Sequence, residues 1–92
     1  MNTTIWKATL RPADEQEISV PVGAELLSAR EQRDQICVWF KCYPNETREK
    51  RTIRICGTGH EAPPFGNAWR FLGTVSLHGG DLMFHVFEKR AV

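Results

Sequence analysis

The chain has 92 residues, with 12 basic and 11 acidic side chains, and a formal net charge of +1. Hydrophobic residues make up 41% and charged residues 25%, which is typical of a folded globular domain and excludes a disordered tail. The balanced charge argues against bulk nucleic-acid binding, and no run approaches the ~20 apolar residues of a membrane span. We expect one domain over residues 1–92, no membrane partner, and a core thin enough to favour a homo-oligomer.

The cysteines indicate a reducing environment. All three, Cys37, Cys42 and Cys56, lie in apolar stretches, and an odd number is a poor disulfide framework. The N-terminus lacks the apolar segment of a signal peptide. We therefore expect reduced, buried thiols and a cytoplasmic location.

The first half of the chain alternates apolar and polar residues with the period of two that predicts β-strands. Residues 3–10 present one apolar face. Residues 17–23 form a second short strand, which Pro21 restricts to an edge or a strand end because proline cannot donate a ladder hydrogen bond. Residues 36–43 are apolar on both faces, which predicts a position at the centre of a sheet.

The segment between these strands is ambiguous. Residues 24–35 begin with strong helix formers, yet their apolar positions do not sustain a helical stripe past one turn. A strand that runs into a polar turn at residues 32–35 is the favoured interpretation. A helical turn over residues 24–30, or in the loop at residues 61–68, is the alternative.

The second half of the chain predicts three more strands. Residues 51–57 alternate, and residues 69–77 and 82–90 form a hairpin around Gly79 and Gly80, which supply the positive φ of a tight turn. The apolar side chains expected to share one face of each hairpin arm are Phe71, Val75 and Leu77 in the first and Leu82, Phe84 and Val86 in the second.

These elements predict an all-β fold. About seven short, mostly antiparallel strands would form a small sandwich or a partly open barrel, with at most one short helix. Neither an alternation of strands and helices nor an internal repeat is present.

Four motifs in order resemble a family of small bacteriophage-associated proteins of unknown function. The motifs are "IWK" at residues 5–7, "GAELLS" at residues 23–28, "RTIRICGTGH" at residues 51–60 and the segment from Gly73 to "FHVFE" at residues 84–88. The resemblance implies a phage-encoded accessory protein in the cytoplasm of an infected bacterium. It implies no catalytic residue.

The candidate binding site is the loop that follows residue 56. In "GTGH", two glycines around a threonine let successive backbone amides converge into an anion-binding nest, which a neighbouring arginine, histidine and tryptophan would complete. The predicted ligand-binding residues are Arg54, Thr58, Gly59, His60 and Trp69. The basic run at residues 48–51 would attract an anion. The alternative is that the glycines only end a strand and start a long loop.

Metal and covalent chemistry have weaker support. The histidines His60, His78 and His85 lack zinc-ligand spacing, so His85 is expected to hydrogen-bond within a sheet face and His78 to occupy a turn. Cys56 precedes His60 by four residues, but no recognised nucleophile motif surrounds the pair. We expect no enzyme activity, no cofactor and no metal.

The resulting hypothesis is a non-catalytic phage protein that counters host immunity. It would sequester a small anionic ligand, such as a cyclic or ADP-ribose-type signalling nucleotide, at an oligomer interface. The alternative is an inhibitor that docks directly on a host or defence protein through Trp6, Trp39 and Trp69. A virion component, or an enzyme that uses Cys56 or His60, are weaker alternatives.

Overall fold

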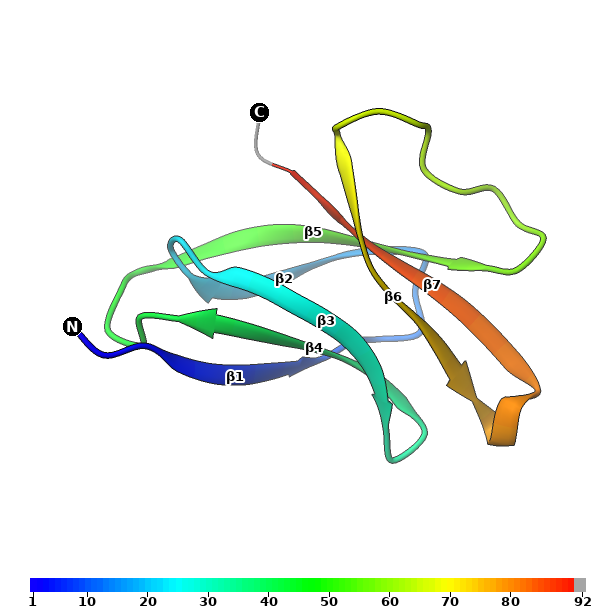
Figure 1. The fold of residues 1–92 in the computed structure, drawn as a ribbon, viewed down its shortest axis with the longest axis horizontal. Coiled ribbons are helices and arrows are strands. Elements are labelled where there is room, and N and C mark those ends of the chain that lie inside the picture. The colour runs from blue at the N-terminus through cyan, green and yellow to red at the C-terminus, as the bar shows by residue number, and fades with distance from the viewer. Residues whose placement is uncertain (91–92) are drawn as a thin grey trace.

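The computed structural model describes residues 1–90 and consists of seven strands and one turn of 3-10 helix (Figure 1). The elements are β1 (Thr4–Thr9), β2 (Glu15–Pro21), β3 (Glu25–Gln32), β4 (Gln35–Cys42), β5 (Arg48–Gly57), β6 (Trp69–Leu77), η1 (His78–Gly80) and β7 (Leu82–Lys89). No helix in this part of the chain is long and apolar enough to cross a membrane.

The strands form two antiparallel sheets. One has three strands in the order β1-β4-β3, and the other has four in the order β2-β5-β7-β6. They pack as an open sandwich rather than a closed barrel, and the loop between β5 and β6 projects away from both sheets (Figure 1). The predicted all-β fold is confirmed. Strand β4 lies at the centre of its sheet, and Pro21 lies on an edge strand, as expected.

The core lies between the sheets and follows the predicted alternation in most strands. Ile53 and Ile55 of β5 face inward, as do Val38 and Phe40 of β4. The side chains of all three cysteines are buried and reduced, as expected. The buried core residues are Leu10, Ile18, Val20, Ala24, Leu26, Ala29, Ile36, Val38, Phe40, Cys42, Ile53, Ile55, Leu72, Val75 and Val86.

The helix alternatives were wrong. Residues 25–32 form strand β3, in which a bulge between Leu26 and Ser28 brings Leu26 and Ala29 to the core although they are three positions apart. The bulge therefore explains why the segment shows no clean period of two. Residues 61–68 contain no helix, and the one helical turn is η1, in the hairpin where only a tight turn was expected. Gly79 and Gly80 do have positive φ, as predicted.

The expected faces of the hairpin were partly wrong. A second bulge, between Phe71 and Gly73, turns Phe71 outward, where its side chain is 53% exposed, and buries Leu72 in its place. Val75 and Val86 do face the core, whereas Leu82, at the start of β7, is exposed. Phe71 instead packs edge-on against Phe87 on the outer face of the four-stranded sheet.

Candidate functional site

Two of the four backbone amides of the predicted nest are already bonded within the protein. The Thr58 amide donates to the Met83 carbonyl at 3.3 Å, which continues the β5–β7 register by one rung. The His60 amide donates to the Gly57 carbonyl at 3.0 Å and closes a turn in which Gly59 has a φ of +89°. The expectation of an open nest at residues 57–60 is therefore wrong, because strand pairing and a turn consume two of its donors.

The other predicted site residues divide into separate groups. Arg54 lies beside Trp69, with the guanidinium carbon 6.0 Å from the ring centroid, and its Nη2 donates to Glu61 Oε1 at 3.3 Å. The exposed carboxylate of Glu61 therefore competes with any anion for Arg54. The basic run at residues 48–51 is engaged as well: Arg48 lies over the Trp6 ring, and Arg51 contacts Glu88.

Thr58 is exposed, and its hydroxyl contacts a histidine. Its Oγ1 lies 2.8 Å from His85 Nε2, and the other ring nitrogen, Nδ1, lies 3.0 Å from Thr74 Oγ1. The prediction that His85 hydrogen-bonds within a sheet face is confirmed. Cys56 lies directly across the ladder from His85. Since both ring nitrogens are occupied by threonine hydroxyls, His85 is not placed to accept a thiol proton.

Burial also makes Cys56 a poor nucleophile. Its side chain is only 5% exposed, and this desolvation raises the pKa of the thiol above its ordinary value, with the Arg54 guanidinium opposing the rise. The thiol is therefore protonated at neutral pH. Among residues 1–90 no group of three His, Cys, Asp or Glu side chains is close enough to hold a metal ion.

A pocket of about 450 Å³, here named the end pocket, opens where the two sheets separate at one end of the sandwich. Its floor is apolar and its rim is polar, an arrangement typical of small-molecule sites. The floor consists of Leu10, Ile36, Ile55, Leu77 and Phe84, and the rim includes Arg11, Asp14, Asp34, His60 and His78. Of the five predicted site residues, His60 alone reaches this pocket.

Three rim side chains have polar groups to offer a ligand. In the part of the chain that the structure describes, the side chains of Arg11, Asp14 and His60 make no hydrogen bond or ion pair with protein groups. The backbone beneath them is held in place, because the Gln16 side-chain amide bonds both the N–H and the C=O of Arg11 at 2.9 Å. The rim therefore combines free donors and acceptors with a rigid support.

A junction between two hairpins forms one wall of the end pocket. Asp34, in the β3–β4 turn, accepts a hydrogen bond from the His78 amide at 2.7 Å, and its other oxygen lies 3.7 Å from His78 Nε2. Arg33, Asp34 and His78 all have positive φ, which is uncommon for residues other than glycine. This backbone strain is concentrated where β3–β4 meets β6–β7. His78 is thus a turn residue, as predicted, and also a link between the sheets.

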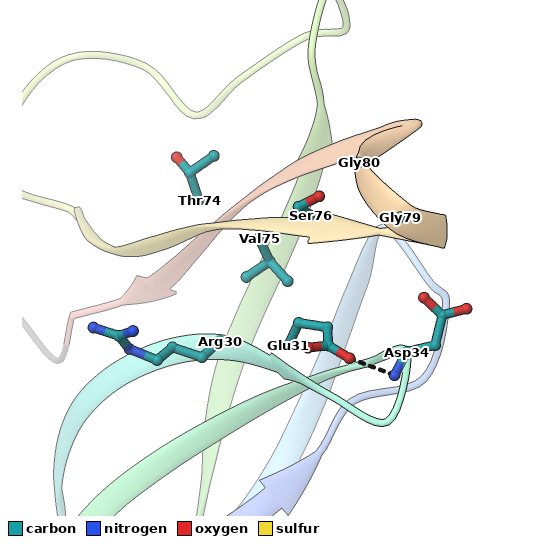
Figure 2. A pocket seen from close by; sticks show the side chains of 8 residues that line it. All are labelled: Arg30, Glu31, Asp34, Thr74, Val75, Ser76, Gly79 and Gly80. Carbon is teal, nitrogen blue, oxygen red and sulfur yellow. Dashed lines mark hydrogen bonds between the residues drawn. The ribbon is translucent and has the colours of Figure 1, made fainter.

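A second hollow of about 510 Å³ lies on the other side of this junction and shares Asp34 with the end pocket. Figure 2 shows that Val75 points from β6 toward β3, whereas Thr74 and Ser76 point away from it, and that the Glu31 carboxylate bonds the Asp34 amide. Arg30 extends away from Glu31 (Figure 2), and the hollow is an open groove in which Val75 is the one aliphatic side chain among the lining residues. The end pocket is therefore the stronger candidate.

A family model with the description Domain of unknown function (DUF7352) matches residues 1–92. No curated protein and no solved structure matches the chain. The match spans the whole chain and so includes every residue of the end pocket.

Proposed function

The chain belongs to the family Domain of unknown function (DUF7352), and we propose that it is a non-catalytic binding protein that holds one small molecule in the end pocket. The observation that carries the proposal is an apolar floor beneath unpaired polar side chains, in a pocket of about 450 Å³. This volume lies within the range of roughly 300–1,000 Å³ that small-molecule sites occupy.

The rim chemistry suits a flat heterocycle better than a bare anion. Two carboxylates, Asp14 and Asp34, stand against the single guanidinium of Arg11, so the rim does not concentrate positive charge. A nucleobase buries its ring faces on apolar side chains and presents donors and acceptors at its edge. We therefore keep a signalling nucleotide as the proposed ligand, with the base in the end pocket and the phosphate outside, near Arg11.

Isothermal titration calorimetry with nucleosides, cyclic nucleotides, ADP-ribose and inorganic phosphate tests this proposal. Ala13→Leu adds bulk to the pocket wall, and Ala62→Leu, in the exposed loop, is the matched control. Saturable binding of a nucleoside or nucleotide that Ala13→Leu abolishes and Ala62→Leu retains supports the site. Binding of phosphate alone, or no heat with any compound, contradicts it.

Exposed aromatic side chains favour a second candidate function, direct binding to a host or defence protein. Phe65, in the projecting loop, is fully exposed, and Phe71 is largely exposed. The tryptophans expected as anchors are less accessible, because Trp39 and Trp69 are half-buried. Aromatic side chains, phenylalanine included, are enriched at protein interfaces, and Phe65 follows two prolines in the projecting loop.

One biological experiment separates the two candidates and tests the proposed phage context. The chain is expressed in the cytoplasm of bacteria that carry a nucleotide-signalling defence system, and phage plating is measured. Ligand sequestration predicts that protection of the phage is lost with Ala13→Leu and retained with Phe65→Ser. Protein docking predicts the reverse. No effect of the unmodified chain on plating refutes the anti-defence proposal, and mass spectrometry of purified particles tests a virion role.

A further inference from the structure

The free sheet edges differ in how they are protected. The four edge strands are β1 and β3 in one sheet and β2 and β6 in the other. Strands β3 and β6 cover each other, since β6 passes so close to β3 that a Cβ on Gly73 would lie 2.5 Å from the Ala29 carbonyl oxygen. Strand β2 carries two exposed glutamates and ends in Pro21, which are common devices that block edge pairing.

Strand β1 carries one charged side chain, Lys7, which is itself an edge protection, but no other strand covers it. It has six residues, without proline or bulge, and its side chains Ile5 and Trp6 are 56% and 37% exposed. Among the edge strands of the described chain, β1 is therefore the least protected against pairing with another strand.

The register shows which backbone groups of β1 are free. The Leu10 amide donates to the Ile36 carbonyl at 2.8 Å, which makes this a hydrogen-bonded antiparallel pair. Because such pairs alternate along a ladder, Ala8 and Trp6 also bond β4, and the N–H and C=O groups of Ile5, Lys7 and Thr9 point away from the sheet.

We propose that a second copy of the chain pairs antiparallel with this edge and joins the two three-stranded sheets into one six-stranded sheet. A two-fold axis at Lys7 would set two like charges opposite each other, which is destabilising. An axis at Trp6 instead pairs Ile5 with the partner's Lys7, exchanges both of their backbone hydrogen bonds, and sets the two partly exposed Trp6 side chains opposite each other. Charge and apolar contact therefore favour the register centred on Trp6.

The size of the contact predicts a reversible dimer. A strand of six residues is ~20 Å long. Pairing along it buries on the order of 300 Å² per copy, less than the roughly 800 Å² of a standard stable interface. The dimer should therefore form at high protein concentration and dissociate on dilution.

Analytical ultracentrifugation from micromolar to millimolar concentration tests the proposal with proline variants. Lys7→Pro removes an outward N–H, a position where edge strands tolerate proline, and should abolish the dimer. Lys7→Thr keeps the N–H but loses the side chain and its hydrogen bond to Gln32, so it should still dimerise. The matched control is Glu17→Pro on β2. The Ile55 amide donates to the Asp14 carbonyl, so Asp14 and every second residue after it bond β5. The N–H of Glu17 therefore points away from the sheet, as that of Lys7 does.

Hydrogen exchange makes the result independent of the variants. If the proposal is correct, exchange of the Ile5 and Lys7 amides slows as the concentration of the unmodified chain rises, whereas exchange of the Glu17 amide does not change. A chain that stays monomeric at millimolar concentration overturns the proposal. So does a Lys7→Pro variant that dimerises as strongly as the unmodified chain, or equal concentration dependence at Glu17.

Discussion

The crossing of β6 over β3 at Gly73 predicts a large effect from one added methyl group. A Cβ at this position would lie 2.5 Å from the Ala29 carbonyl oxygen, where distances below 3.0 Å are essentially never found, so Gly73→Ala must separate the two backbones by at least 0.5 Å. Backbone atoms cannot rotate aside as a side chain does. Overpacking of this kind costs about 1–3 kcal/mol, and at 4–8 °C per kcal/mol the melting temperature should fall by about 5–20 °C.

Thermal unfolding followed by circular dichroism measures this loss, and Gly57→Ala is the matched control. A Cβ on Gly57 would meet the His60 ring at an ordinary 3.5 Å, and the backbone there does not require glycine. The control should be neutral or stabilised by about 0.4–1 kcal/mol, because alanine restricts the unfolded chain. Equal melting temperatures for Gly73→Ala and the unmodified chain would refute the close approach of the two strands.

Two further predictions concern buried side chains: one is a substitution of Glu88 and the other is the chemical modification of Cys56. Glu88, 2% exposed, accepts hydrogen bonds from Arg51 at 2.7 Å and Arg70 at 3.0 Å. Glu88→Gln should therefore destabilise the fold by about 2–3 kcal/mol in urea unfolding, against less than ~0.5 kcal/mol for the exposed control Glu17→Gln. Burial raises the pKa of Cys56, so its thiol should react with iodoacetamide more slowly than a model peptide at pH 8, and only unfolding should expose it. The Cys56 thiol ionises at a lower pH in the unfolded chain than in the folded one. Its contribution to the free energy of unfolding is therefore complete below the pKa of the unfolded chain. That contribution is lost as the pH rises through the higher pKa of the folded protein. Rapid labelling of Cys56 in the native protein, located by mass spectrometry, would contradict this.

The strands were predictable from the sequence because each buries one face against a single layer. Alternation predicted that Ile53 and Ile55 face the core, as they do. The prediction was wrong at Phe71, because a bulge adds one residue to β6 between Phe71 and Gly73. The side chains that precede the bulge in this strand therefore lie on the opposite face from the one predicted. A bulge leaves the composition of a strand unchanged, so a period of two cannot reveal it.

The candidate site was less predictable, for two physical reasons. A glycine-rich turn can expose its amides or bond them, and the outcome depends on whether a neighbouring strand continues past it, as β7 does beside Thr58. The end pocket, in turn, draws Arg11, Asp34 and His60 from three separate connections. Of these three residues, Asp34 alone lies in a segment that the sequence predicted as a tight turn, residues 32–35.

The geometry of the two proposals also changes what is expected of ligand binding. The sequence led us to expect the ligand at an oligomer interface. In a dimer centred on Trp6, however, the Leu10 ends of the two β1 strands point in opposite directions and lie ~26 Å apart, so each end pocket is complete within one chain. Ligand binding should then be one to one and non-cooperative, with the same affinity below and above the concentration of dimerisation, and Lys7→Pro should bind as the unmodified chain does. Calorimetry at both concentrations checks this. An affinity that rises with dimerisation, or that falls with Lys7→Pro, would mean that the partner's residues complete the pocket and that the axis does not lie at Trp6.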